Sequence, residues 1–158
     1  MTGYYSRQTC LNGHVISNTI GAPHTTPQPH CGRCGAATIV NCPGCEAPQR
    51  GNFSNFIGWG SKTPNSFCSN CGKPYPWTER QIASTTALIN EEELLSQEEK
   101  VLLTSTLTDL ASDTPNTVLA ATRFKRIVTK VGGTFKAAIY KFVVDVSSET
   151  AKKIVLGE

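Results

Sequence analysis

The chain has 158 residues, with 15 Lys or Arg against 12 Asp or Glu and a formal net charge of +3. Residues 1–76 contain only 12 Val, Ile, Leu, Phe, Met or Trp, whereas residues 77–158 contain 26. The first part is therefore too poor in apolar side chains to fold by burial alone. No stretch of the sequence approaches the roughly 20 apolar residues of a membrane-spanning helix, which excludes that class of protein.

Every cysteine of the chain lies in one of four close pairs of potential metal ligands within the first part. Each pair can bind one ion from a tight turn, so eight ligands make two tetrahedral sites. Thiolates with a single imidazole and no carboxylate beside them favour zinc. We therefore predict two structural Zn²⁺ ions that hold the first part together. The pairs are Cys10/His14, Cys31/Cys34, Cys42/Cys45 and Cys68/Cys71.

Two other interpretations of the cysteines are weaker. Disulfides require an oxidising compartment, but residues 1–5 show neither the basic nor the apolar region of a signal peptide, so we expect a cytoplasmic protein. Seven is also an odd number, and the remaining partner of Cys10 is a histidine. A zinc deaminase requires His-x-Glu, but Val15 and Ile16 follow His14, and Pro43 lies inside a cysteine pair rather than before it.

The assignment of pairs to ions is open between two arrangements. Residues 37–40 (Ala-Thr-Ile-Val), which lie between the second and third ligand pairs, predict a short strand. An extended strand of six residues holds its ends roughly 20 Å apart, so the two pairs lie at its opposite ends. The second and third pairs therefore cannot share an ion. An interleaved order joins the first pair with the third and the second with the fourth, whereas a sequential order joins the first two and the last two. We favour the interleaved order.

The second part predicts helices with clear boundary signals. The sequence Pro-Trp-Thr-Glu at residues 76–79 begins a helix that reaches about Asn90, and Ser96 with Glu99 forms a capping box before the next helix. Pro115 at a first helical position begins the third, which the glycines at 132–133 end. The last helix carries apolar residues from Phe135 to Val146, and a continuation to Val155 is an open alternative. The predicted fold is a metal-stapled zinc-ribbon module with short β-hairpins, residues 1–76, followed by a bundle of three to four helices, residues 77–158.

Apolar residues recur at helical spacing in this part and predict the faces that form its core. A surplus apolar face for a partner is the alternative interpretation. The first two helices present Ile82, Leu88, Ile89, Val101, Leu102, Leu107 and Leu110; the third presents Val118, Ala121, Phe124, Ile127, Val128 and Val131; the last presents Phe135, Ile139, Phe142, Val143 and Val146.

A loop between the third and fourth ligand pairs, residues 50–60, contains three aromatic residues and one arginine. Phe53, Phe56 and Trp59 can form an apolar lid on the zinc module, joined by Trp77. Alternatively, these aromatic side chains can stack on bases or fill a pocket of a partner. We therefore treat Phe53, Phe56 and Trp59 as candidate partner contacts.

Formal charge is unevenly distributed along the chain. Residues 1–77 carry five basic residues and one acid, but seven thiolates and two dications reduce their net charge to near +1. Residues 78–113 carry two basic residues against eight acids, and residues 114–158 carry eight against three. The best basic patch lies on the third helix, where a solvated face is the simpler interpretation and nucleic-acid contact the alternative. It comprises Arg123, Lys125, Arg126 and Lys130.

The first ligand pair forms a Cys-Leu-Asn-Gly-His motif, and the last belongs to Cys-Ser-Asn-Cys-Gly-Lys-Pro-Tyr-Pro-Trp. These motifs resemble an uncharacterised family of bacterial zinc-ribbon proteins, a domain of unknown function that begins with Cys-x-Asn-Gly-His and ends its ribbon in Cys-Gly-Lys-Pro-x-Pro-Trp. The resemblance covers the first half strongly and the helical part loosely. It implies two metal sites on the eight ligands and a bacterial or phage source, but no activity. His24 and His30 lie outside the pattern and are expected in loops.

No catalytic motif is present, since the sequence lacks a Walker A loop, Gly-x-Ser-x-Gly and His-Glu-x-x-His. We therefore expect a non-enzyme without a small-molecule substrate: a zinc-binding adaptor or accessory subunit that acts through protein contacts, with self-association through the helical tail as one option. The alternative is a nucleic-acid-binding zinc-ribbon protein, such as a regulator or an accessory of a mobile-element or phage-defence system. Neither function involves a membrane.

Overall fold

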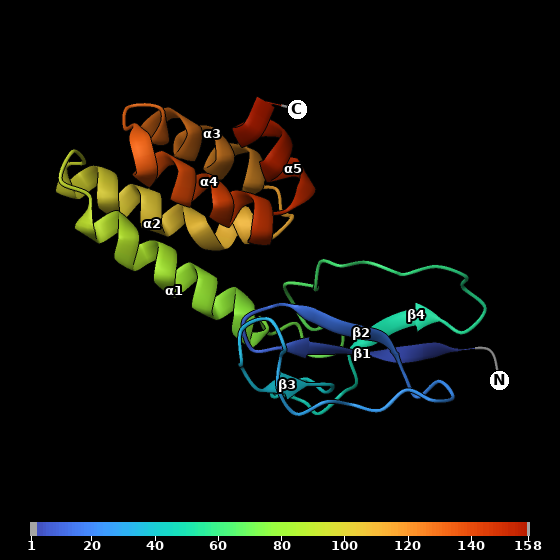
Figure 1. Ribbon diagram of the computed structural model, residues 1–158. Coiled ribbons are helices and arrows are strands. Elements are labelled where there is room, and N and C mark those ends of the chain that lie inside the picture. The colour runs from blue at the N-terminus through green and yellow to red at the C-terminus, as the bar shows by residue number, and fades with distance from the viewer. Residues whose placement is uncertain (1–2, 158) are drawn as a thin grey trace. The chain divides into compact units, whose positions relative to one another are not determined.

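The structure is a computed structural model that describes residues 3–157, and it divides into two compact units (Figure 1). One unit ends at Glu79 and contains the strands, whereas the other begins at Arg80 and contains helices. A small antiparallel sheet with two Cys/His clusters is thus followed by a helical region, which confirms the predicted fold class.

The sheet of the first unit is built around its first strand. Strand β1 pairs antiparallel with all three others, while the sheet order β2-β1-β3 places β2 at an edge. Strand β3 lies opposite the C-terminal end of β1, and β4 lies opposite its N-terminal end. The predicted strand at residues 37–40 is therefore present but short. The strands are β1 (Tyr4–Cys10), β2 (Val15–Ile20), β3 (Thr38–Ile39) and β4 (Arg50–Phe53).

Three of the ligand pairs occupy one repeated turn. The N–H groups of Cys31, Cys42 and Cys68 each donate to the carbonyl five residues later, at 2.8–2.9 Å. The carbonyl of each of these cysteines accepts from the N–H four residues later, also at 2.8–2.9 Å. That fourth residue has φ between +61° and +74°, a region in which a residue without Cβ is unstrained. It is Gly35 in the second pair, Glu46 in the third and Gly72 in the fourth.

A small aromatic core covers the later ligand pairs. The rings of Tyr75 and Trp77 stack with centroids 4.6 Å apart, and both side chains are buried with Cys42 and Cys68. The indole N–H of Trp77 donates to the carbonyl of Asn65 at 2.9 Å. The predicted lid of loop aromatics with Trp77 is therefore wrong, because Tyr75 fills the space beside Trp77 and the loop aromatics remain exposed.

Within residues 3–157, five α-helices follow the sheet, and the boundary between the units falls within the first of them. The capping box of Ser96 and Glu99 is present, as predicted. Helix α3 begins two residues after Pro115, which lies in a turn, and the last helix does not continue to Val155. The helices are α1 (Pro76–Glu91), α2 (Gln97–Ala111), α3 (Thr117–Val128), α4 (Gly133–Val146) and α5 (Glu149–Lys152), followed by a π-helical turn (Lys153–Gly157).

The apolar core of the second unit surrounds α3, which packs against α2, α5 and the π-helical turn. The predicted apolar faces of α3 and α4 are buried, except for Val118. Thr117 is buried in its place and donates its hydroxyl to the carbonyl of Ser112 at 2.7 Å. None of the helices within residues 3–157 has the length and apolar character that crossing a bilayer requires. The largest fully buried side chains here are Phe124, Phe142, Ile89, Leu103, Leu107, Leu110 and Ile139.

Candidate metal centres

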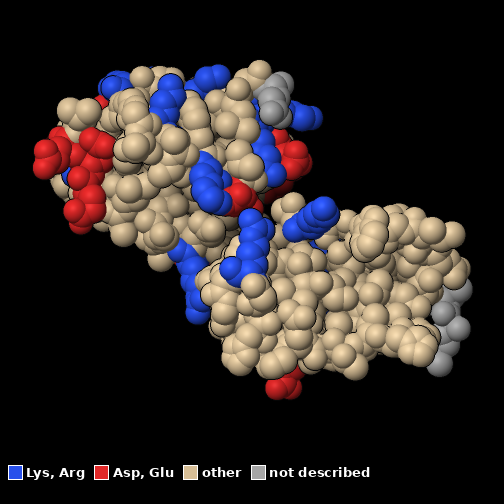
Figure 2. Space-filling model, in the orientation of Figure 1, with Lys and Arg blue, Asp and Glu red and all other residues tan. Residues whose placement is uncertain are grey.

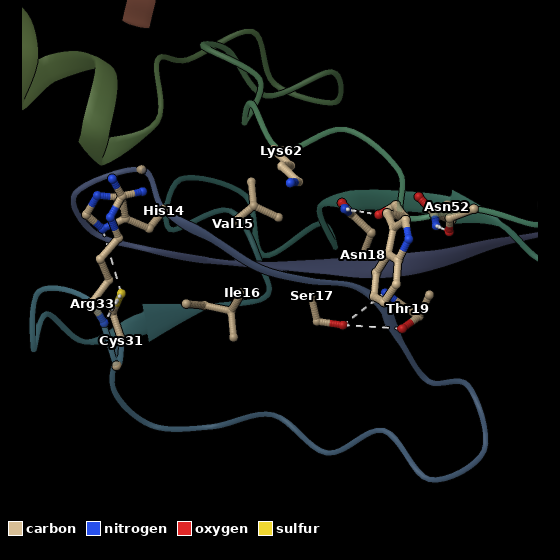
Figure 3. Close-up of a pocket in the computed structure, with 14 residues that line it drawn as sticks. His14, Val15, Ile16, Ser17, Asn18, Thr19, Cys31, Arg33, Asn52 and Lys62 are labelled. Carbon is tan, nitrogen blue, oxygen red and sulfur yellow. Dashed lines mark hydrogen bonds between the residues drawn. The ribbon is translucent and has the colours of Figure 1, made fainter.

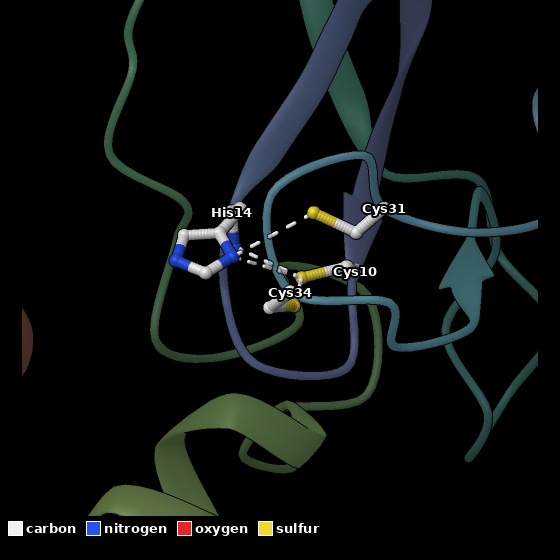
Figure 4. A group of neighbouring side chains, drawn as sticks. All are labelled: Cys10, His14, Cys31 and Cys34. Atoms are coloured by element: carbon white, nitrogen blue, oxygen red, sulfur yellow. Dashed lines mark hydrogen bonds between the residues drawn. The ribbon is translucent and has the colours of Figure 1, made fainter.

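The first cluster joins the first two ligand pairs at the end of the β1–β2 hairpin (Figure 4). The Nδ1 atom of His14 lies 3.5 Å from Sγ of Cys10 and 3.7 Å from Sγ of Cys31, and Sγ of Cys10 lies 3.7 Å from Sγ of Cys34. All four ligand atoms lie within 4.8 Å of one another. One side chain from each of four positions therefore points toward a common centre.

The second cluster joins the last two ligand pairs beneath the aromatic core. Sγ of Cys42 lies 3.8 Å from Sγ of Cys71, and Sγ of Cys45 lies 3.8 Å from Sγ of Cys68. These four sulfur atoms also lie within 4.8 Å of one another. All eight predicted ligands thus belong to two four-membered clusters suited to metal ions.

The order of the ligand pairs is sequential, so the favoured interleaved arrangement is wrong. The N–H of Leu11 donates to the carbonyl of Ala37 at 2.9 Å, and Cys10 pairs with Thr38 in the sheet. The β1–β3 pairing therefore places the turn that precedes β3 beside the first ligand pair. The premise that β3 separates the second and third pairs is correct, but long-range strand pairing decides which pairs meet.

Backbone N–H groups surround the sulfur atoms of both clusters. In each cluster two cysteines accept such a hydrogen bond within their own turn, at 3.3–3.4 Å. Hydrogen bonds of this kind stabilise a thiolate relative to a thiol. The donors are His14 to Cys10, Arg33 to Cys31, Gly44 to Cys42 and Asn70 to Cys68.

Two asparagines, neither of which was predicted from the sequence, extend this pattern with their side chains. The Nδ2 atom of Asn12 donates to Sγ of Cys34 at 3.4 Å, and that of Asn70 donates to Sγ of Cys45 at 3.5 Å. Each asparagine lies between the two ligands of one pair and reaches a ligand of the other pair in its cluster. The position of Asn inside a pair of ligands was the available signal.

The pKa values of the cysteines show the crowding of the sulfurs. Hydrogen bonds from the backbone of Ala36 and the side chain of Asn12 lower the pKa of Cys34 to about 6. Although the backbone of Lys73 lowers the pKa of Cys71, desolvation and the three neighbouring sulfurs raise it to about 11. Neighbouring thiolates disfavour each other's charge, and a bound dication removes this conflict.

The loop that follows β4 exposes its aromatic residues at the surface. Phe53, at the end of β4, packs edge-on against Tyr4 with ring centroids 5.3 Å apart. Phe56 is 55% exposed, Ile57 100% and Trp59 93%. We call these last three residues the loop tip. Ile57 was not among the predicted contacts.

A buried polar pair holds the base of this loop. Nε of Arg7 donates to Oδ1 of Asn18 at 2.7 Å, and both side chains are buried. Nδ2 of Asn18 then donates to the carbonyls of Trp59 and Ser61, at 3.3 and 2.9 Å. Desolvation by burial lowers the pKa of Arg7, although Tyr75 acts in the opposite direction. The backbone beneath the loop tip is thus fixed by specific hydrogen bonds, while its apolar side chains remain in solvent.

A groove of about 730 Å³ lies between this loop and the first cluster (Figure 3). The groove is lined by residues 13–19, by residues 31–33 and by Asn52, Gly58, Trp59 and Lys62. Arg33 and Lys62 supply basic groups, and no acidic residue is among those that line the groove.

The four basic residues predicted on α3 are all exposed, but two of them bind other parts of the same unit. Nζ of Lys130 lies 2.6 Å from a carboxylate oxygen of Glu99, and Nζ of Lys125 donates to the carbonyl of Ile154 at 3.0 Å. Arg123 and Arg126 are exposed one turn apart. On the face in Figure 2, the second unit carries both acidic and basic side chains, whereas the first is largely uncharged. His24 and His30 are exposed outside the named strands.

Comparison with known proteins gives one family match. The model of a family described as "Uncharacterized protein conserved in bacteria (DUF2321)" matches residues 3–155, and thus nearly the whole chain. No curated protein and no solved structure matches the chain.

Proposed function

The chain belongs to the DUF2321 family of bacterial proteins, and from this premise we propose that it is a non-catalytic zinc-binding interaction module. In this proposal two structural Zn²⁺ ions fold the first unit, which then presents the loop tip to a protein partner. The observation that carries the proposal is the combination of two complete four-ligand clusters with an apolar loop tip on an ordered polar base.

The spacing of the ligand atoms supports zinc as the metal. A tetrahedral ion with Zn–S bonds of about 2.3 Å holds its sulfurs about 3.8 Å apart, and the Zn–N bond of a histidine shortens the S···N edge to about 3.6 Å. S···S distances of 3.7 and 3.8 Å occur in the clusters, and Nδ1 of His14 lies 3.5 Å from the Cys10 sulfur. Thiolate-rich ligand sets also suit zinc better than hard cations.

The ligand number supports a structural rather than a catalytic role. A catalytic zinc site keeps one position for water or substrate, whereas a structural site is filled by four protein ligands. Each cluster supplies four. We therefore assign no chemistry to either ion beyond holding its two turns together.

The exposed apolar side chains of the loop tip support the proposal of a protein partner. Apolar and aromatic side chains such as Phe56, Ile57 and Trp59 contribute most binding free energy when they are buried in a partner's pocket. Ordering of a loop on binding normally costs free energy, and the hydrogen bonds from Asn18 to this loop reduce that cost in advance. Apolar residues exposed on the second unit, such as Leu119 and Val144, give self-association as a further option for the helical tail.

The test is affinity capture from a nuclease-treated lysate of the native host, with elemental analysis of the purified protein. We expect two zinc ions per chain and a partner protein that is lost with Phe56→Ser/Ile57→Ser. Leu94→Ser, which removes an exposed apolar residue from the other unit, is the matched control and should retain the partner. Equal recovery of every protein by the loop variant and the control would overturn the proposal.

Nucleic-acid binding by the first unit and α3 is the second candidate, and the exposed pair Arg123 and Arg126 favours it. The contacts of Lys125 and Lys130 with Ile154 and Glu99 weaken it. If α3 binds phosphates, affinity for a DNA or RNA duplex falls steeply with salt, and each neutralised contact reduces the log–log slope by nearly one. Substitution of the four basic residues of α3 with Gln then separates the candidates. Capture of a protein partner persists if the protein contact is correct, and nucleic-acid binding disappears if α3 binds phosphates.

A further inference from the structure

The edge strand β2 has an open segment next to the first cluster. Among the described residues, β2 pairs only with β1, through Val15 with Thr9 and Ser17 with Gln8, and no other strand pairs with its opposite edge. The far end of the strand is different. The carbonyl of Thr19 accepts from Ala22 and from the Thr25 hydroxyl, and its N–H donates to the Ser17 hydroxyl. The fold thus uses one end of this edge and leaves the other end available.

The groove runs along this open edge. Side chains of successive strand residues point to opposite faces of a sheet. All residues from Val15 to Thr19 nevertheless line the groove, which is expected of a cavity beside the strand rather than over one face. Figure 3 shows Lys62 and Ile16 on opposite sides of β2, with Arg33 toward the cluster.

We propose that this groove binds an extended peptide segment carrying acidic side chains, which adds as a strand to the edge of β2. The inference rests on the proposed function and specifies the chemistry of the partner. Strand addition provides main-chain hydrogen bonds, and pockets beside the strand provide specificity. The amino acids of the segment are then selected by the charges that line the groove.

Charge complementarity identifies the segment as acidic. Arg33 and Lys62 are exposed residues at two points of the groove, and no carboxylate lines it. A segment at the β2 edge advances about 3.3 Å per residue, so carboxylates a few residues apart can reach both cations. Trp59 adds an exposed ring at the end away from the cluster.

A single nucleic-acid strand is the competing occupant. It would place phosphates near Arg33 and Lys62 and stack a base on Trp59. Such a ligand makes no use of the backbone groups on the edge of residues 15–17 that faces away from β1, whereas an added strand pairs with them. The open edge therefore favours the peptide, and the nucleic acid becomes an outcome of the test.

The experiment is a selection from a synthetic library of ten-residue peptides with randomised central positions, bound to the zinc-loaded full chain. We expect enrichment of Asp and Glu, and affinity of the best peptide at least tenfold weaker for Lys62→Glu. Arg50→Glu, an exposed residue of the same unit outside the groove, makes the same charge change and should leave affinity unchanged. Both variants are first checked for two zincs per chain.

N-methylation of the selected peptide tests strand addition without altering the protein. Methylation at every second amide should weaken binding at least tenfold, and methylation at the intervening amides should have little effect, because donors of an added strand alternate between its edges. A library without acidic preference, an affinity unaffected by Lys62→Glu or an absence of this alternation would overturn the proposal. Tighter binding of a twelve-nucleotide oligothymidylate, lost with Lys62→Glu, would replace the peptide with nucleic acid.

Failure of this inference and failure of the proposed function are distinguishable. Phe56 and Ile57 lie outside the groove, whereas Lys62 lines it. If the peptide does not bind but capture of a partner still depends on Phe56 and Ile57, the groove proposal fails alone. If capture is independent of the loop tip as well, both proposals fail.

Discussion

The two units of this protein differ in the side chains that they bury. In the first unit the buried apolar cluster consists of Cys42, Cys68, Tyr75 and Trp77, so half of it is candidate metal ligands. In the second, whole side chains such as Phe124, Phe142 and Leu107 are removed from water. Burial of this kind contributes roughly 1.5–3 kcal/mol for each large apolar side chain. We therefore propose that the first unit depends on metal ligation for its stability, whereas the second depends on packing.

Removal of the metals should separate the two units most clearly. A structural zinc site contributes an apparent free energy of about 10–16 kcal/mol, more than a small apolar cluster can replace. Both tryptophans lie in the first unit, so in a Trp59→Phe background the fluorescence of buried Trp77 reports on that unit alone. We expect chelation to shift this fluorescence to the red, while the circular dichroism signal of the helices largely remains.

Two results would contradict this comparison. Loss of the helical signal in step with the fluorescence would mean that the second unit also requires metal. Retention of the Trp77 signal after both ions have been removed, verified by elemental analysis, would mean that the first unit folds by packing.

The ligand pairs should next show coupling within a cluster and independence between clusters. His14→Ala and Cys34→Ser remove ligands of one ion, so their effects on stability should be less than additive. His14→Ala and Cys42→Ser affect different ions and should be additive within about 0.5 kcal/mol. Metal content and denaturation of all single and double variants provide the measurement. Coupling of His14 with Cys42 and not with Cys34 would support the interleaved order instead.

The sequence predicted which residues form ligand pairs better than it predicted which pairs meet in one cluster. Spacing identifies a turn that can bind an ion, because both ligands lie within a few residues. The choice between orders depends on the β1–β3 pairing, whose residues Cys10 and Thr38 are 28 positions apart and have no distinctive sequence pattern. The same limit explains the missed pair Arg7 and Asn18, since each is an ordinary polar residue until the fold brings them together.

The apolar faces of the helical part were largely predictable, although Val101 and Val118 are exposed, and the helix ends were less so. The stripe through Phe124 and Val128 follows from a period of 3.6 residues, and the structure buries it. Pro115 was assigned to the first turn of α3, but it lies in the preceding turn, where its fixed φ is equally favourable. Helix α4 ends at Val146, where Ser147 is its C-cap and Ser148 is the N-cap of α5.

Loss of the Asn70 side chain should reduce zinc affinity less than loss of any ligand but more than loss of a neighbouring side chain. Its amide donates to the Cys45 sulfur, and loss of such an outer partner typically costs 10–100-fold in metal affinity. We expect Asn70→Ala to weaken zinc binding at the second cluster by about tenfold, measured by competition with a chromogenic chelator. Ser69→Ala, at an exposed position of the same turn, should have little effect. Equal affinities for the two variants would show that the hydrogen bond contributes nothing.

The smallest predicted effects concern Ser147 and Ser148, at the end of α4. The Oγ atom of Ser147 is buried and has no hydrogen-bond partner among the described residues. A buried, unsatisfied hydroxyl costs about 1–3 kcal/mol, so Ser147→Ala should raise the free energy of unfolding of the second unit by about 1 kcal/mol. Ser148, one residue later, accepts from the N–H of Ala151 as the N-cap of α5.

Ser148→Ala should therefore lower the same quantity by about 1 kcal/mol. Chemical denaturation followed by helical circular dichroism measures both changes in the zinc-loaded chain. Opposite signs at adjacent serines are expected only if packing and hydrogen bonding, rather than the metals, determine the stability of this unit. A decrease in the free energy of unfolding for both variants would show that the Ser147 hydroxyl has a hydrogen-bond partner in solution. Trp77 fluorescence should be unchanged in either case, because Trp77 lies in the other unit.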